Sequence, residues 1–206
     1  MSFDLSDAEG EYLVRLGRRA ITSYLTEGEV IEEEPPYPSL KKEAGTFVTL
    51  KRYPSGDLRG CIGFPEPIYP LHVAVVRAAI ASATEDPRFL PVKASELPDL
   101  IVEVSVLSPP ELIRVDDKGA LPREVVVGRD GLIIKRGPWS GLLLPQVPVE
   151  LRWDSETFLD QTCLKAGLPP GCWRWPDVQV YRFTAIVFSE IRPLGPVRRV
   201  PLTECT

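Results

Sequence analysis

The segment TFVTLKRYPSGDLRGCIG, residues 46–63, shows how the chain begins to fold. TFVTLKRY carries the β-branched and aromatic residues typical of a strand, PSGD is typical of a turn, and LRGCIG has the length of a second strand. The proline-rich loop FPEPIYP follows, and then LHVAVVRAAIASATED, residues 71–86, which is apolar on nearly all sides before Pro87. We therefore predict two strands joined by a turn, followed by a buried helix that ends near the proline.

A second part of the chain repeats this order of features. LKRYPSGDLRGCIGFPEP and IKRGPWSGLLLPQVPVE, residues 50–67 and 134–150, each contain a strand ending in Lys-Arg and a turn with proline and Ser-Gly. A second strand, a proline-containing loop and a helix follow in both. Either the match is coincidental, or GCIGF and LPQV are equivalent positions in the two halves of a duplicated arrangement.

The remaining elements indicate the fold class. Ser6 and Glu9 have the spacing of a capping box ahead of an amphipathic helix that reaches about Leu25 and ends near Gly28. An exposed acidic loop follows, and alternation in DLIVEVSVLS places Val102, Val104 and Val106 on one face of a strand, with Glu103 on the other. Further predicted elements are a hairpin in VVVGRDGLIIKR, a helix from near Asp154, and one last long strand in VQVYRFTAIVFSE. We predict a single α+β domain over residues 1–206, with mostly antiparallel sheet and two closely packed subdomains that no linker separates.

Composition and charge exclude several classes of protein. The 206 residues are 44% hydrophobic and 26% charged, and no apolar run approaches the roughly 18 residues of a membrane span. The net charge is -5 and the basic residues are scattered, which argues against nucleic-acid binding. The basic run RPLGPVRRV at residues 192–200 is interpreted as a solvated tail. The acidic N-terminus lacks the pattern of a signal peptide, so a cytoplasmic location is expected.

The four cysteines and one histidine do not form a metal-binding pattern. No C-x-x-C spacing is present, so no metal site is predicted. Cys163 and Cys172 flank a helix end and a turn, and a disulfide between them is conceivable. The chain has 22 prolines, one methionine and no asparagine, a composition resembling that of heat-adapted proteins, in which intracellular disulfides occur. The spacing leaves this bridge open because it does not give the geometry.

Cys61 is the main candidate for a reactive group. If LRGCIG is a strand, Arg59, Cys61 and Gly63 lie on one side of it, and a guanidinium near the thiol would favour the thiolate. Gly60 and Gly63 lack Cβ atoms and would let a ligand or another backbone approach closely. The alternative is that Cys61 is a small buried residue and that Gly60 marks a bulge or tight packing.

Other side chains are weaker candidates. Glu103 interrupts an apolar strand and could be a general base, a structural ion-pair partner of Arg59, or part of a solvated face. Gln146 could present its amide to a ligand or to a buried backbone group. His72 could pair with Cys61, although no spacing places it there. Arg88, in the turn that ends the buried helix, is expected to pair with an acidic side chain; the alternative, a ligand-binding role, has no independent support in the sequence.

Six blocks in order resemble the AMMECR family, which is named for the chromosomal region of Alport syndrome, midface hypoplasia and elliptocytosis. They are LRGCIG, ATEDPRF, ELPDLIVEVSVLSPPE, VGRDGLII, GLLLPQVPVE and ETFLDQTCLKAGLP, and the prokaryotic branch is the most similar. The resemblance implies an α+β fold built from a duplicated strand and helix arrangement, with LRGCIG as its proposed functional surface.

The resemblance implies no established activity and no known cofactor. It suggests a pathway shared with Memo-like and radical S-adenosylmethionine proteins. Two hypotheses follow. The first is a module that binds a small molecule or a partner protein around LRGCIG, with Arg59, Gly60, Gly63 and Gln146 as binding residues. The second is an enzyme or modification factor that uses Cys61 as its reactive thiol and Glu103 to handle protons.

Overall fold

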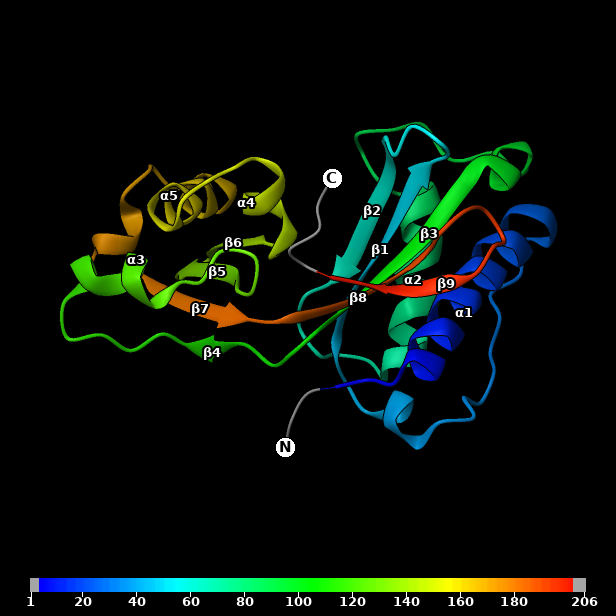
Figure 1. Cartoon of the computed structure of the whole chain (residues 1–206), viewed down its shortest axis with the longest axis horizontal. Helices are drawn as coiled ribbons and strands as arrows, with labels where there is room; N and C mark the ends of the chain where they lie inside the picture. The colour runs from blue at the N-terminus through cyan, green and yellow to red at the C-terminus, as the bar shows by residue number, and fades with distance from the viewer. Residues whose placement is uncertain (1–3, 202–206) are drawn as a thin grey trace. The chain divides into compact units, whose positions relative to one another are not determined.

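The computed structural model describes residues 4–201, and the chain divides into two compact units. The first takes in the chain up to Leu107 together with Ile186–Val200, and the second takes in Ser108–Ala185. Each unit contains its own sheet (Figure 1). Each also has its own cluster of buried hydrophobic residues. Among the helices of residues 4–201, none combines the length and the hydrophobicity that crossing a membrane requires.

The sheet of the first unit has five strands in the order β2-β1-β3-β8-β9. β1 pairs antiparallel with both β2 and β3, and β8 pairs antiparallel with β9. Two long helices, α1 and α2, lie against one face of this sheet (Figure 1). The elements are α1 (Asp7–Glu27), β1 (Gly45–Arg52), β2 (Leu58–Phe64), α2 (Leu71–Thr84), β3 (Leu100–Leu107), β8 (Ala185–Glu190) and β9 (Val197–Val200), with 3₁₀ turns η1 (Pro38–Lys41) and η2 (Ala94–Asp99).

α1 begins and ends where the sequence predicts. The Ser6 hydroxyl accepts a hydrogen bond from the Glu9 amide, and the Glu9 carboxylate accepts one from the Ser6 amide, so the capping box is formed. The helix continues to Glu27 and ends at Gly28, whose φ of 76° is the left-handed conformation that glycine adopts readily.

The alternation predicted for residues 100–107 separates a core face from a polar face. Val102, Val104 and Val106 are fully buried in the cluster formed with α1 and α2. Glu103 and Ser105 lie on the opposite face of β3 and are buried as well. The sheet therefore has polar side chains out of water on the face that α1 and α2 do not cover, and such groups need partners.

A buried ion pair joins α1 to the sheet. Arg18 donates through Nε and Nη2 to the carboxylate of Glu190, and its guanidinium also reaches the carbonyl oxygens of Leu97 and Leu100. The Glu190 carboxylate accepts a further hydrogen bond from the Val102 amide. Because both charges are out of water, these hydrogen bonds offset their desolvation and orient α1 on β3 and β8.

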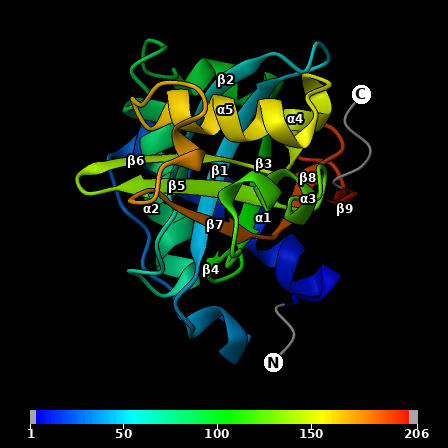
Figure 2. The ribbon, with the colours of Figure 1, turned by 90° about the vertical axis from the view of Figure 1, so that its left-hand side faces the viewer.

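The second unit has a four-stranded sheet in the order β4-β7-β5-β6. All three ladders in it, β4 with β7, β7 with β5, and β5 with β6, are antiparallel. Figure 2 shows α5 along the β5-β6 side of this sheet. The elements are β4 (Glu111–Leu112), η3 (Lys118–Ala120), α3 (Leu121–Glu124), β5 (Gly131–Arg136), β6 (Trp139–Leu143), α4 (Gln146–Glu150), α5 (Ser155–Lys165), η4 (Cys172–Arg174) and β7 (Gln179–Phe183).

The β1-β2 and β5-β6 hairpins share one packing feature. A Cβ added to Gly60, in β2, would lie 2.1 Å from the carbonyl oxygen of Ser82 near the end of α2. A Cβ added to Gly141, in β6, would lie 2.3 Å from the backbone nitrogen of Ala166 at the end of α5. In both units a glycine in the second strand of the hairpin thus lets a following helix come close.

Three local predictions were wrong. Residues 125–127 do not form a strand, because the Asp130 carboxylate accepts the Val126 amide and closes a turn there; the hairpin is instead β5 with β6. The predicted last long strand is two strands, β7 and β8, which end and begin on either side of Thr184 and belong to different sheets. Residues 197–200 are not a solvated tail but the edge strand β9, where Arg199 lies over the Phe188 ring.

Cys163 and Cys172 form the disulfide that the spacing left open. Both cysteines are fully buried in the core of the second unit, beside Trp173. The bridge links α5 to η4 across the intervening turn.

We expect reduction of this disulfide to destabilise the second unit. Closing a loop of nine residues in the unfolded chain gives about 2.5 kcal/mol in the chain-entropy model. The measurement is thermal unfolding with and without a phosphine reductant, with Cys163→Ala/Cys172→Ala as the second arm. An unchanged melting temperature in both arms would show that packing alone holds α5 and η4 together.

Candidate functional site

Two of the sequence blocks meet around Cys61. The Asp86 carboxylate, in ATEDPRF, accepts a hydrogen bond of 2.8 Å from the amide of Cys61, in LRGCIG. The same carboxylate binds the Arg88 guanidinium through Nε at 2.9 Å and Nη2 at 2.7 Å. Arg88 Nη2 also donates to the Cys61 carbonyl oxygen at 3.3 Å. The backbone amide of Cys61 is therefore bound by the buried Asp86, and its carbonyl oxygen is bound by Arg88, the ion-pair partner of Asp86.

Ser82 holds the next residue of the strand. Its hydroxyl accepts the Ile62 amide at 2.8 Å and donates to the Val48 carbonyl oxygen at 2.7 Å. With Gly60 seated against the Ser82 carbonyl, the last turn of α2 sets the position of β2. Gly63 is also confined, since an added Cβ would lie 2.2 Å from the Thr46 carbonyl oxygen. Both glycines thus serve close backbone approach within the first unit.

A polar row crosses three strands at this point. Thr49 is paired with Cys61 on one side and with Glu103 on the other, so the three side chains share one face of the sheet. The Thr49 hydroxyl donates to Cys61 Sγ at 3.2 Å, and Lys51 Nζ lies 3.0 Å from Glu103 Oε2. The next residue along this face of β3 is Ser105, whose buried Oγ has no hydrogen-bond partner within residues 4–201.

The charge environment of Cys61 favours the thiol. Burial raises the pKa of Cys61 above its ordinary value, and the charges of Glu103 and Asp86 act in the same direction. The hydrogen bond from Thr49 and the charge of Arg88 lower it, but burial is the largest effect. At neutral pH the half-buried sulfur is therefore a neutral thiol, with less thiolate than an exposed cysteine has.

We expect Cys61 to react with iodoacetamide more slowly than free cysteine at pH 7, by about threefold or more, and the rate to keep rising at pH values where free cysteine is already fully ionised. The measurement is mass spectrometry of the Cys61 peptide over time in a Cys205→Ser background. Cys61→Ser in the same background is the control for labelling elsewhere. Alkylation faster than that of free cysteine would support the enzyme hypothesis instead.

Arg59 does not act on Cys61 in the way the sequence suggested. Arg59 is 6% exposed, and its guanidinium binds both carboxylate oxygens of Glu96, at 2.9 and 3.0 Å, as well as the Leu90 carbonyl oxygen at 2.9 Å. These contacts hold the pKa of Glu96 at about 2. The cation that lowers the Cys61 pKa is Arg88, which the sequence placed in an acid-paired turn without linking it to Cys61. Nor is Arg59 the partner of Glu103, which pairs with Lys51.

The other candidates are divided between the units. Cys61, Gly60, Gly63 and Glu103 lie together in the sheet of the first unit. Gln146 is the first residue of α4 in the second unit, and its Oε1 is buried without a hydrogen-bond partner in the described part of the chain. His72 donates through Nδ1 to the Leu40 carbonyl oxygen, whereas the side chain that donates to Cys61 Sγ is Thr49.

Sequence reasoning missed Thr49, Ser82 and Asp86 as parts of this site. Pairing across strands puts Thr49 beside Cys61, and the DPR turn at the end of α2 puts Asp86 there. The signal for Asp86 was present, since ATEDPRF is one of the six blocks. Within residues 4–201, no group of three or more His, Cys, Asp or Glu side chains is arranged to hold a metal ion.

The comparisons with known proteins identify the family. The AMMECR1 family profile matches residues 14–188, so the chain belongs to the AMMECR1 family. It is similar to Protein PH0010 of Pyrococcus horikoshii, with 57% identity over 98% of this chain and 100% of that protein. A protein of Thermococcus gammatolerans is 58% identical over 97% of this chain and 99% of its own length.

The fold has a counterpart among solved structures. The crystal structure of the uncharacterized protein PH0010 from Pyrococcus horikoshii superposes with a TM-score of 0.93, over 97% of this chain and 100% of that chain. The α+β fold with antiparallel sheets is therefore confirmed, and so is the family predicted from the six blocks. The names of these relatives state no activity.

Proposed function

We propose that the chain is a binding module whose site is the polar face around Cys61, Thr49 and Arg88. The observation that carries the proposal is that Arg88 is exposed and is fixed in position by Asp86. Its side chain is 52% exposed and is held in place by Asp86 through Nε and Nη2, while Nη1 has no hydrogen-bond partner in the part of the chain that the structure describes. A fixed guanidinium with free N–H groups is suited to a carboxylate or phosphate group.

The neighbouring groups have matching roles in this proposal. The neutral thiol of Cys61 and the hydroxyl of Thr49 contact the uncharged part of the ligand, and Glu103, neutralised by Lys51, limits which charges can approach. Arg59, Gly60 and Gly63 hold β2 and do not themselves contact the ligand. Gln146, a candidate in the second unit, stays a prediction.

The enzyme hypothesis is the second candidate, and no observation favours it over binding. A nucleophilic cysteine needs its pKa lowered, whereas burial raises the pKa of Cys61. Proton handling by Glu103 would require a carboxylate free to exchange protons, and Lys51 is paired with it.

The binding proposal is tested by titrating the protein with inorganic phosphate and following backbone amide signals of residues 59–63 by NMR. We expect saturable shifts in the native protein, weaker binding by about threefold or more in Arg88→Gln, and partial retention in Arg88→Lys, which keeps the charge. Arg114→Gln is the matched control, because Arg114 is exposed and lies in the second unit. Equal titrations of the native protein and of Arg88→Gln would contradict the proposal.

The family resemblance suggests the partners. We propose Memo-like and radical S-adenosylmethionine proteins, which would present an acidic side chain or an anionic product to Arg88. Purified partners are tested by biolayer interferometry against the native protein, Arg88→Gln and Arg114→Gln. Loss of binding in the first variant alone is the expected result, and no binding to the native protein would remove these partners from the proposal.

A cytoplasmic location also stays a prediction, which cell fractionation checks.

A further inference from the structure

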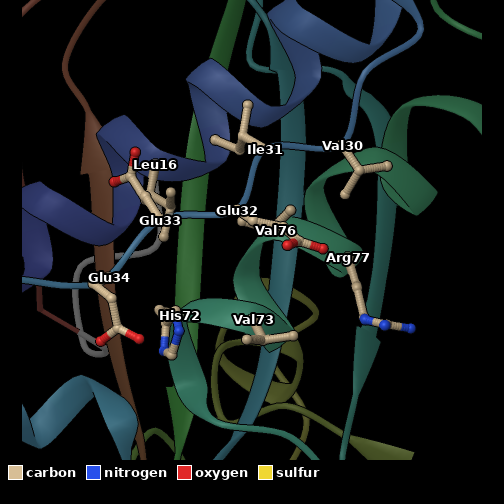
Figure 3. A pocket seen from close by; sticks show the side chains of 10 residues that line it. All are labelled: Leu16, Val30, Ile31, Glu32, Glu33, Glu34, His72, Val73, Val76 and Arg77. Atoms are coloured by element: carbon tan, nitrogen blue, oxygen red, sulfur yellow. The ribbon is translucent and has the colours of Figure 1, made fainter.

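A groove in the first unit lies beside the acidic connector between α1 and η1. Its volume is about 360 Å³, within the range of small-molecule sites. Apolar side chains come from three segments: Leu16 from α1, Val73 and Val76 from α2, and Val30 and Ile31 from the connector (Figure 3). The groove thus has aliphatic walls and contains neither Cys61 nor Arg88.

Three consecutive carboxylates, Glu32, Glu33 and Glu34, line the same groove. The Glu33 carboxylate accepts hydrogen bonds of 2.5 Å from both the Tyr12 hydroxyl and Arg19 Nη2, so its charge is matched. The Glu34 carboxylate pairs with Lys41. Glu32 is exposed and has no ion-pair or hydrogen-bond partner within residues 4–201, and Figure 3 draws its carboxylate beside Val76. One unmatched negative charge therefore adjoins the aliphatic walls.

His72 supplies a second acceptor. Its Nδ1 lies 3.0 Å from the Leu40 carbonyl oxygen, which can only accept, so Nδ1 carries the proton and Nε2 of the neutral ring is left as an acceptor. The ring lies near the Glu34 carboxylate, which pairs with Lys41. His72 and Glu34 thus form an acceptor end of the groove separate from Glu32.

The one arginine that lines the groove does not cancel this charge. The Arg77 guanidinium lies 4.7 Å from the centre of the Tyr69 ring, in a cation–π contact. It makes no ion pair with any of the three glutamates in the described residues, and Figure 3 shows it directed away from Glu34 and His72. The Glu32 carboxylate and His72 Nε2 therefore remain available for a cationic donor.

We propose that this groove binds a short aliphatic diamine. One ammonium pairs with the Glu32 carboxylate, the other donates to His72 Nε2 beside Glu34, and the methylene chain lies on Val73, Val76 and Leu16. Charge complementarity selects against fatty acids and other anions, and the aliphatic walls select against small hydrated cations. This site is independent of the binding proposed at Cys61, and either can fail alone.

The probe for the test is 1,6-diaminohexane, titrated by calorimetry and by proton NMR of the imidazole signal. His72 is the only histidine in the chain, so that signal needs no further assignment. We expect saturable binding that shifts the imidazole signal, weaker binding of 1-aminohexane, and none of hexanoate or 1,6-hexanediol. Hexanoate or hexanediol binding as well as the diamine would overturn the proposal.

Two variants and one control separate the groove from general attraction to an acidic protein. Glu32→Gln should raise the Kd about threefold to fivefold, as loss of one exposed ion pair does. Val73→Lys, which puts an ammonium into the groove, should abolish binding. Glu29→Gln removes an equal charge from the same connector outside the groove and should leave the Kd within about twofold. Equal weakening by Glu29→Gln and Glu32→Gln would show nonspecific attraction and overturn the proposal.

Discussion

Gly60→Ala is expected to destabilise the protein by about 3 kcal/mol or more, because the new methyl group has no room. Its Cβ would lie 2.1 Å from the Ser82 carbonyl oxygen, a backbone atom at the end of α2 that cannot rotate away. Relief requires α2 to move off β2, which would break the hydrogen bonds of Ser82 to Ile62 and Val48. The measurement is the free energy of unfolding from urea denaturation.

Gly17→Ala is the matched control for Gly60→Ala. Gly17 is buried in α1, but its added Cβ would have no neighbour closer than 3.6 Å, an ordinary van der Waals contact. Alanine also has a helix propensity up to about 1 kcal/mol more favourable than that of glycine. We therefore expect Gly17→Ala to be neutral or stabilising. If both variants lose stability equally, the close approach of β2 and α2 is not what makes Gly60 necessary.

Asp86→Ala is the second substitution with a large expected effect, and it should lower the free energy of unfolding by about 3 kcal/mol. Asp86 is 4% exposed and accepts hydrogen bonds from the Cys61 amide, the Arg88 amide and the Arg88 guanidinium. Its removal leaves the Cys61 amide without its acceptor and frees Arg88. The control is Asp116→Ala, at an exposed position that makes no such contacts within residues 4–201, and it should change stability by less than about 0.5 kcal/mol.

The contribution of Asp86 should depend on pH with a defined sign. Arg88, followed by the hydrogen bonds from the amides of Cys61 and Arg88, lowers the pKa of Asp86 from 3.8 to about 2. The folded state therefore binds this proton less readily than the unfolded state. The stabilisation, about 2 kcal/mol, is complete above about pH 4 and is lost as the pH falls through about 2.

Comparing the native protein with Asp86→Asn in urea at several pH values tests this sign. The difference in unfolding free energy should be constant between about pH 5 and 7 and should shrink progressively below about pH 4. A difference that grows on acidification would mean that Asp86 is already protonated in the folded protein and that its bond to Arg88 is not ionic.

The sequence by itself predicted the parts of the fold that depend on local chemistry. The capping box at Ser6, the glycine stop at Gly28, the alternation in β3 and the β1-β2 hairpin follow from propensity and periodicity, which neighbouring residues determine. The hairpin predicted around Asp130 was wrong because a carboxylate there bonds back to the Val126 amide, a contact that the strand-like composition of residues 125–127 does not reveal.

The partners of the site were decided by tertiary structure. Arg59 and Cys61 are two residues apart in one strand, yet Arg59 binds Glu96 while Cys61 is bound by Asp86 and Arg88. Strand pairing, not sequence distance, put Thr49 between Cys61 and Glu103. The pKa of Cys61 likewise depends on how deeply the folded chain buries the thiol and on how close Arg88 lies to it. Burial is the larger effect.

The sequence alone therefore identified the family, the fold class and LRGCIG as a key segment. These depend on local residue patterns and on the order of the six sequence blocks. Only the folded chain decided what LRGCIG contacts. Gly60 is needed because a carbonyl of α2 lies against it, and Cys61 is a neutral thiol because the sheet buries it. The contacts of Gly60 with Ser82 and of Cys61 with Asp86 join residues more than twenty positions apart, so neither follows from local sequence.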